Sequence, residues 1–178
     1  MKIGLVPGAM KPYHAGHHFL VESALRECDK VVIFTTVKDR DDLSGANMQL
    51  AWNELIIPNI EGNVEVSFIK SPVGSVYEVI EAENESPTSD TYRIYGGTED
   101  VKRFNMTRIS ARYPNTAGRF VNVAAEGKAS YLRGDGTPKA KGSWARAALQ
   151  ISDKLTFKAQ LPKFLQPHAQ RYMEILSR

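Results

Sequence analysis

Residues 8–17 of the chain are Gly8-Ala9-Met10-Lys11-Pro12-Tyr13-His14-Ala15-Gly16-His17. An apolar run at residues 3–6 precedes them, and residues 19–25 after them carry apolar side chains at helical spacing. The segment is therefore predicted to connect a buried strand to a helix, with glycines that let the backbone approach a ligand closely. Pro12 disfavours an earlier helix start, so we expect the helix to begin near Gly16.

The two histidines of this loop have the spacing of a phosphate site. His14 and His17 are three residues apart, so at a helix start they project to one side. Free amide groups at a helix N-terminus attract an anion, and two imidazoles beside them can donate hydrogen bonds to phosphate oxygens. The loop predicts a polyphosphate site, although a glycine turn with two surface histidines is the simpler interpretation of the histidines alone.

The loop resembles the G-x-F-x-P-x-H-x-G-H signature of the nucleotidylyltransferase superfamily, the adenylyl- and cytidylyltransferases with an HxGH motif. The residues in register are Gly8, Pro12, His14, Gly16 and His17, and Met10 replaces the usual Phe. The resemblance implies a Rossmann-like, doubly wound α/β sheet. It also implies transfer of a nucleoside monophosphate from a nucleoside triphosphate to a small phosphorylated acceptor, with release of pyrophosphate.

The resemblance also implies roles for the loop residues. His14 and His17 would bind phosphoryl oxygens in the transition state, and Lys11 would add a cation. The nucleotide-binding residues of this motif would be Pro7, Gly8, Ala9, Met10 and Gly16. A Mg²⁺ ion is expected to bind through the substrate phosphates. No protein metal ligands are expected, because the histidines lack partner acids at ligand spacing.

A second motif lies at residues 139–146, with the sequence Lys-Ala-Lys-Gly-Ser-Trp-Ala-Arg. Ser143 is predicted to be the N-cap of a helix that carries Arg146 on its first turn, which makes a second anion site. The segment is similar to the superfamily's I-S-x-T-x-[VI]-R motif, with Lys141 in place of the first serine and Trp144 at a variable position. Ser143 and Arg146 would then hold the β- and γ-phosphates. An ordinary basic helix cap is the simpler interpretation of this segment by itself.

A third segment follows the expected strand at residues 92–95, which ends in Gly96-Gly97. It resembles the superfamily's G-x-D segment near the nucleotide base and ribose, with Glu99 or Asp100 as the acid. Thr98 is predicted to cap a short helix here. A plain glycine turn is the alternative interpretation. Weaker candidates for binding the phosphorylated acceptor are Lys38 and Arg103.

Strands and helices are predicted to alternate along the 178 residues, which we expect to form a single domain over residues 1–178. The expected strands are residues 3–6, 30–36, 64–69, 92–95 and 120–123. The first helix is expected to end near residue 27, and further helices are expected at residues 46–57 and 73–83. This alternation indicates an α/β fold with about five parallel strands.

Composition excludes several classes of protein. The net charge of +3 includes no dense Lys/Arg tract, so no nucleic-acid partner is expected. No apolar run reaches transmembrane length, and the sequence begins with a strand and not with a signal peptide, so we expect a cytoplasmic protein with no membrane partner. A single cysteine rules out an internal disulfide framework. A homo-oligomer is left open.

The nucleotide is expected to be ATP in preference to CTP, because the R-T-x-G-I-S-T motif of many cytidylyltransferases is absent from the sequence. Similar adenylyltransferases act on nicotinamide mononucleotide and phosphopantetheine. An aminoacyl-tRNA synthetase is disfavoured, because the chain has no room for a KMSKS-type loop and an anticodon domain. A non-catalytic nucleotide-binding or regulatory module with a degenerate second motif is the main alternative.

Overall fold

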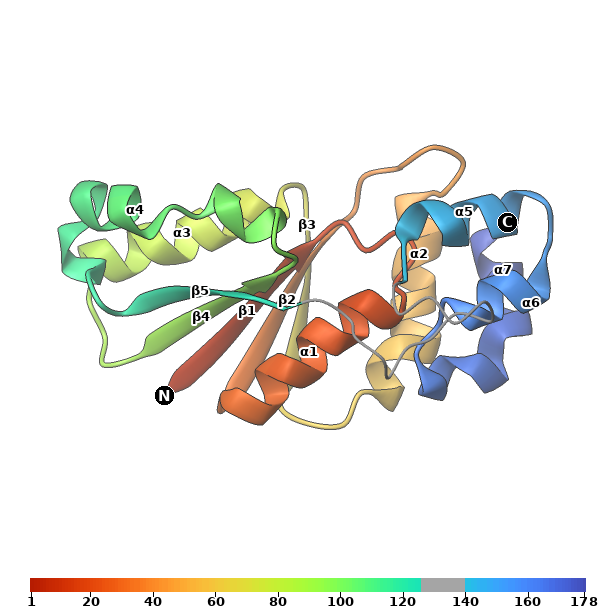
Figure 1. Cartoon of the computed structure of the whole chain (residues 1–178), viewed down its shortest axis with the longest axis horizontal. Helices are drawn as coiled ribbons and strands as arrows, with labels where there is room; N and C mark the ends of the chain where they lie inside the picture. Colours follow the sequence, from red (N-terminus) through yellow and green to blue (C-terminus); the bar gives the residue numbers. More distant parts are fainter. Residues whose placement is uncertain (126–139) are drawn as a thin grey trace. The chain divides into compact units, whose positions relative to one another are not determined.

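The computed structural model of the chain describes residues 1–125 and 140–178. These residues fall into two compact units, each assembled from separate stretches of sequence. The first unit comprises Met1–Ala9, Leu20–Thr35 and residues 62–125, and the second comprises Met10–Phe19, Thr36–Glu61 and residues 140–178. Whether the chain behaves as one domain, as the sequence predicts, stays a prediction. Figure 1 shows the elements in chain order.

The sheet contains five strands in the order β3-β2-β1-β4-β5 (Figure 1). The strands are β1 (Lys2–Gly8), β2 (Lys30–Thr36), β3 (Val64–Ile69), β4 (Thr91–Gly96) and β5 (Phe120–Ala124). β1 runs parallel to both β2 and β4, and β4 runs parallel to β5. The strand order therefore reverses beside β1, as in doubly wound folds, and the predicted Rossmann-like α/β class is confirmed.

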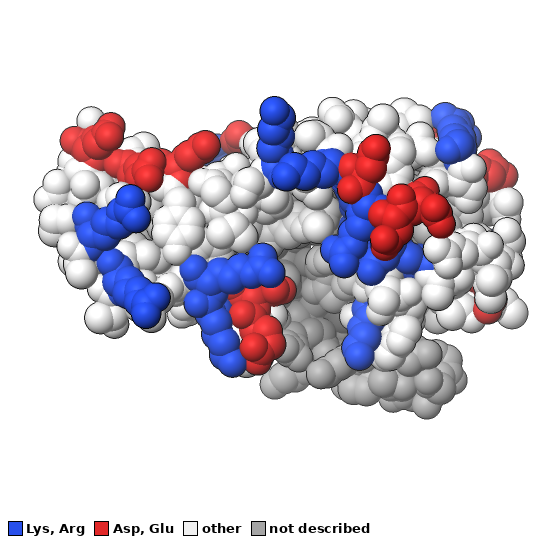
Figure 2. All heavy atoms as spheres, turned by 90° about the horizontal axis from the view of Figure 1, so that it is seen from above, with Lys and Arg blue, Asp and Glu red and all other residues white. Residues whose placement is uncertain are grey.

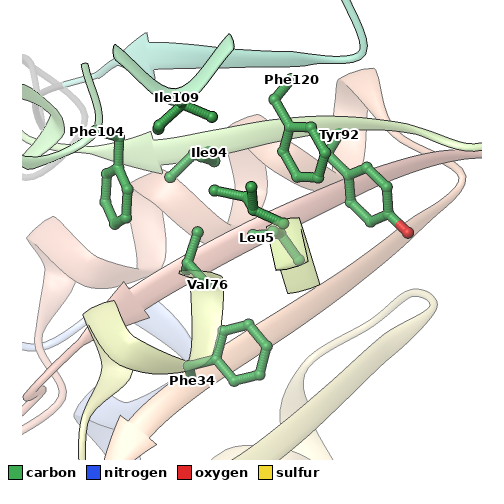
Figure 3. Close-up of a cluster of buried hydrophobic side chains, with 9 residues drawn as sticks. Leu5, Phe34, Val76, Tyr92, Ile94, Phe104, Ile109 and Phe120 are labelled. Carbon is green, nitrogen blue, oxygen red and sulfur yellow. The ribbon is translucent and has the colours of Figure 1, made fainter. Parts of the chain in front are cut away.

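Successive residues of β1 face opposite sides of the sheet, and helices cover both sides. Gly4 faces α1 (Ala15–Glu27), where an added Cβ would lie 3.1 Å from the Ala24 Cβ, so glycine lets this helix pack closely. Leu5, on the opposite face, belongs to a buried cluster with Val76 and Ile80 of α3 (Pro72–Glu85), as Figure 3 shows for Leu5 and Val76. Ile109 of α4 (Met106–Arg112) completes the cover of that face.

Short helices connect β4 to β5. The 3₁₀ helix η3 (Asp100–Arg103) follows the Gly96-Gly97 turn, and η4 (Pro114–Thr116) follows α4. The prediction that Thr98 is the cap of this helix is wrong: the N-cap is Glu99, whose side chain makes no capping bond to η3. Asn105 does cap α4, since its Oδ1 accepts a hydrogen bond from the Arg108 amide.

The second unit is helical. Its elements are α2 (Gly45–Ala51), the π-helix η1 (Trp52–Ile56), η2 (Ile57–Asn59), α5 (Gly142–Gln150), α6 (Lys154–Ala159), η6 (Lys163–His168) and α7 (Ala169–Leu176). The single helix predicted at residues 46–57 is thus three successive helical segments. Ser44 caps α2, and Pro58, which has no amide hydrogen, accompanies the change to 3₁₀ geometry at the far end.

Aromatic side chains of the second unit support the loop at residues 10–17. Tyr13 is fully buried, with its ring centroid 4.8 Å from that of Trp52. The Tyr172 hydroxyl of α7 donates a hydrogen bond of 3.1 Å to the Tyr13 carbonyl. Phe157 of α6 packs edge-on against Tyr172. The loop therefore rests on a packed aromatic core, which restricts its backbone.

Charges of both signs are interspersed on the face shown in Figure 2, where Lys and Arg side chains lie among Asp and Glu side chains. Among the described residues, helices are too short or too polar for any of them to cross a bilayer.

Candidate functional site

The HxGH loop enters α1 through hydrogen bonds that occupy the first two helical amides. The Ala15 amide donates to the Gln160 carbonyl at 2.8 Å, and the Gly16 amide donates to His14 Nδ1 at 3.0 Å. The expectation that these amides are free for an anion is therefore wrong. The helix begins at Ala15, one residue before the predicted start. An anion at this loop would therefore be bound mainly by side chains.

The two histidine rings are fixed in one arrangement. The His14 amide donates to His17 Nδ1 at 3.2 Å, and the rings stack with centroids 3.8 Å apart and planes at 21°. In each ring Nδ1 accepts a backbone hydrogen bond, so the proton of the neutral imidazole resides on Nε2. Two parallel rings therefore each offer one Nε2–H donor.

Both histidines are neutral at physiological pH. Burial, reinforced by the Arg146 charge, lowers the pKa of His14 to about 4. Burial and the neighbouring His14 hold the pKa of His17 well below its ordinary value. The pair therefore contributes neutral hydrogen-bond donors, and any positive charge for binding an anion must come from other residues.

Gly16 is required by the position of the His14 ring. A Cβ built on Gly16 would lie 2.9 Å from His14 Cε1, closer than atoms can approach without displacement. The same Cβ would lie 3.5 Å from the carbonyl oxygen of Ala140, the second residue before α5. The start of α1 and the chain leading into α5 thus lie side by side within this unit.

Lys11 is a buried cation in the same loop. Its side chain is 2% exposed, and Nζ has no hydrogen-bond partner among the residues that the structure describes. Burial lowers the pKa of this amine, an effect that Asp39 opposes and Arg40 reinforces. Burying a charged amine without a partner costs folding free energy, and a bound anion would offset that cost.

Arg146 connects the second motif to the loop. Its Nη1 donates to the Lys11 carbonyl at 2.8 Å, and its Nε lies 3.4 Å from Asp41 Oδ2. Burial lowers the pKa of this guanidinium, and Arg40 adds to the effect. Arg146 also lines a pocket of about 540 Å³ in the second unit, together with Leu43, Leu149 and Arg178.

The predicted cap of α5 is wrong. Lys141 is the N-cap, and its side chain makes no capping bond to this helix. Ser143 is instead the second residue of α5 and is exposed. The helix starts at Gly142, two residues earlier than predicted. A Cβ added to Gly142 would lie 2.9 Å from Arg146 Nη1, so glycine leaves room for the guanidinium.

The other predicted nucleotide-binding residues lie mainly in the first unit. Pro7 and Gly8 end β1, and the Ala9 carbonyl accepts a hydrogen bond of 3.1 Å from Thr35 Oγ1. Met10, in the second unit, is buried and has a φ of 50°, which is unusual for a residue with a side chain.

Gly96 ends β4, and the Gly97 carbonyl accepts a hydrogen bond from the Val101 amide. The two acids of this segment, Glu99 and Asp100, are both exposed, and Glu99 pairs with Lys102 at 2.9 Å. Their role in holding the base or ribose stays a prediction.

The two weaker acceptor candidates are both exposed. Lys38 belongs to the second unit, where its amide donates to Thr36 Oγ1 at 3.1 Å. Arg103 belongs to the first unit, where its carbonyl accepts a hydrogen bond of 2.8 Å from the Tyr77 hydroxyl. Their role in binding an acceptor stays a prediction.

Within the described ranges, no group of three or more His, Cys, Asp or Glu is placed to hold a metal ion. The polar groups gathered at the loop are two neutral imidazoles and the cations of Lys11 and Arg146. These groups suit an anion and offer no oxygen ligand for Mg²⁺.

One residue of this region was missed by sequence reasoning. Gln160 is fully buried, and its main-chain and side-chain oxygens both accept backbone hydrogen bonds at the site. It is a single polar residue two positions before Pro162, and no periodicity or motif distinguishes it. Only the packing of α6 reveals its position.

Neither a protein-family model nor a curated protein matches the sequence. Solved structures do match the fold of the chain. A protein assigned as a nicotinate-nucleotide adenylyltransferase from Vibrio parahaemolyticus is 15% identical, with a TM-score of 0.60, over 95% of this chain and 98% of that chain. A bifunctional NMN adenylyltransferase/ADP ribose pyrophosphatase from Francisella tularensis is 13% identical, with a TM-score of 0.60, over 97% of this chain and 50% of that one.

A third structure is the nicotinic acid mononucleotide adenylyltransferase of Plasmodium falciparum, in complex with NaAD. It is 13% identical to this chain, with a TM-score of 0.53, over 98% of this chain and 97% of that one. At these identities the likeness establishes the fold: the chain has the fold of these adenylyltransferases.

Proposed function

We propose that the chain is a nucleotidylyltransferase that transfers a nucleoside monophosphate, with AMP favoured, from a nucleoside triphosphate to a small phosphorylated acceptor. The observation that carries the proposal is the paired histidines, whose Nδ1 atoms are occupied by backbone amides. Each ring is left with one Nε2–H donor. The shared fold with three adenylyltransferases supports the same reaction class. We expect the protein to act in the cytoplasm.

The reaction needs positioning and charge stabilisation and no covalent intermediate with the protein. An oxygen of the acceptor phosphate attacks the α-phosphorus in line. A new phosphorus–oxygen bond forms while the bond from the α-phosphorus to the bridging oxygen of the β-phosphate breaks. Pyrophosphate leaves with the electron pair. A phosphate nucleophile is already ionised, so this step requires no general base.

The histidine pair suits this step because its donors are fixed before the substrate arrives. Negative charge builds on the α-phosphoryl oxygens in the transition state, and Nε2–H of His14 and His17 would bind them there. The rings do not have to reorient, since backbone bonds and the 3.8 Å stack hold both. Neutral rings also give up no proton to a phosphate during the reaction.

Positive charge would come from Lys11 and Arg146. Lys11 Nζ is buried without a hydrogen-bond partner in the described part of the chain, and a polyphosphate oxygen would supply one. The Arg146 guanidinium, bonded to the Lys11 carbonyl, would neutralise the departing pyrophosphate. Mg²⁺ would add charge neutralisation as part of the bound nucleotide.

The acceptor we propose is a pyridine mononucleotide. The three solved structures of this fold are described as acting on nicotinate or nicotinamide mononucleotide, and one was solved in complex with NaAD. The product would then be a dinucleotide in which two phosphates are joined. Phosphopantetheine is the acceptor to test beside it.

The test is pyrophosphate release by the full chain with Mg²⁺, either ATP or CTP, and one acceptor at a time. The acceptors are nicotinate mononucleotide, nicotinamide mononucleotide and phosphopantetheine. We expect release with ATP and a pyridine mononucleotide, together with a dinucleotide product of the matching mass. Tight ATP binding without pyrophosphate release from any pair would instead indicate a non-catalytic nucleotide-binding module.

A further inference from the structure

Gln160 joins the starts of the two helices that carry the proposed site. Its main-chain oxygen accepts a hydrogen bond of 2.8 Å from the Ala15 amide, the first residue of α1. Its side-chain Oε1 accepts one of 3.0 Å from the amide of Lys141, the N-cap of α5. One residue therefore contacts both the histidine helix and the arginine helix.

The surroundings of Gln160 hold it in place. It is 0% exposed and lies at the C-terminal end of α6, between buried Phe157 and the buried pair Leu161 and Pro162. Its own amide donates back into α6, to the Lys158 and Phe157 carbonyls. The position of both acceptor oxygens is thus fixed by the helix and by packing.

Burying the side-chain amide of Gln160 at this position costs folding free energy. Its Nε2 is buried and has no hydrogen-bond partner among the described residues, a situation that normally destabilises a protein. An apolar side chain of similar volume would avoid that cost, but it would leave the Lys141 amide without its acceptor. The contribution of the amide here is therefore its Oε1 bond to the start of α5.

We propose that Gln160 is a positioning residue that sets the distance between the histidine pair of α1 and Arg146 of α5. This inference rests on the proposed function, because the spacing matters only if one substrate bridges the two motifs. Arg146 provides a second connection through its bond to the Lys11 carbonyl. A ligand can bind either motif separately, whereas the transition state needs both at once.

The test replaces Gln160 with Met, which is similar in size and has no Oε1 acceptor. We expect kcat to fall by about tenfold to a hundredfold, the effect of a displacement near 1 Å, with a smaller change in KM for the nucleotide. Gln160→Glu keeps an oxygen at the Oε1 position, and we expect it to recover most of kcat. Ile175→Val, a buried change in α7, is the control for lost stability alone.

Amide hydrogen exchange provides a readout that does not depend on turnover. In Gln160→Met, we expect the Lys141 amide to lose protection while the Ala15 amide, bonded to a main-chain oxygen, keeps it. Unchanged protection at Lys141, or kinetics that match Ile175→Val, would overturn the positioning role.

These outcomes separate the two claims. A wild-type protein that neither binds nor turns over a nucleoside triphosphate would refute the proposed function, and the positioning role in the reaction with it. An active wild type whose Gln160→Met variant is equally active would refute the inference about Gln160 alone.

Discussion

Replacing Gly16 with Ala should remove activity while leaving the fold intact. The added Cβ would lie 2.9 Å from His14 Cε1, about 0.5 Å closer than the 3.4 Å at which ordinary contacts begin. The His17 ring stacks on His14 with a centroid distance of 3.8 Å, so a displaced His14 ring either moves His17 or breaks the stack. Loss of a positioned transition-state donor lowers kcat by about 10²-fold or more.

Stability should hardly change. Gly16 lies in the first turn of α1, where Ala is favoured over Gly by up to about 1 kcal/mol. Displacement of the ring and loss of the Gly16 amide bond to His14 Nδ1 would offset that gain. We therefore expect the free energy of unfolding to stay within about 1 kcal/mol of wild type.

The matched control is Gly74→Ala in α3. There the added Cβ would lie 2.9 Å from Ser71 Oγ, and the Gly74 amide donates to that oxygen at 3.0 Å, so the local change is of the same kind. Steady-state pyrophosphate release and chemical denaturation compare the two variants. If Gly16→Ala retains kcat within about threefold of wild type, the fixed arrangement of the rings is not what the reaction requires.

Four further predictions follow from the ionisable groups. Arg146→Lys loses the planar guanidinium that donates to the Lys11 carbonyl, so we expect KM for the nucleotide to rise about tenfold in steady-state assays. Lys11→Met removes a buried amine, and burial lowers the pKa of that amine. Titration of tripolyphosphate binding should show that the affinity of the wild type falls with rising pH, and that the affinity of the variant falls much less. Denaturation across pH should show a stability loss from pH 6.5 to 4, of which His14 contributes about 3 kcal/mol because burial lowers its pKa to about 4. His17, whose pKa burial also lowers, adds to this loss, and His14→Gln should remove only the share of His14. A second loss should follow between pH 4.5 and 2. Burial raises the pKa of Glu83, but hydrogen bonds from Tyr92, Thr88 and Arg119 together outweigh it and hold that pKa at about 2.

The fold was predictable because its strands are short segments rich in β-branched and aromatic residues, bounded by clear breaks. Residues 30–36 and 64–69 match β2 and β3 at both ends, and the other strands agree within two residues. In β2, which is largely buried, the apolar pattern is near-continuous, as in other parallel sheets. The loop between β1 and α1 was predictable for a different reason, because its histidine and glycine spacing is specific.

The details of the site were not predictable because they depend on contacts between distant segments. Ser143 is a good N-cap residue by propensity, yet α5 starts at Gly142. The amide of Ala15 had no partner visible in sequence, and its acceptor is Gln160, far along the chain. Tertiary contacts of this kind override local propensity, and a single sequence carries no record of them.

The most direct test of the central claim, that the histidine pair stabilises the transition state, is the turnover of His17→Ala. The control is His168→Ala, which changes an exposed histidine outside the site. For His17→Ala we expect kcat for pyrophosphate release to fall by at least about 10²-fold, with the Kd for ATP and the free energy of unfolding nearly unchanged. Turnover equal to that of His168→Ala would contradict the role assigned to His17.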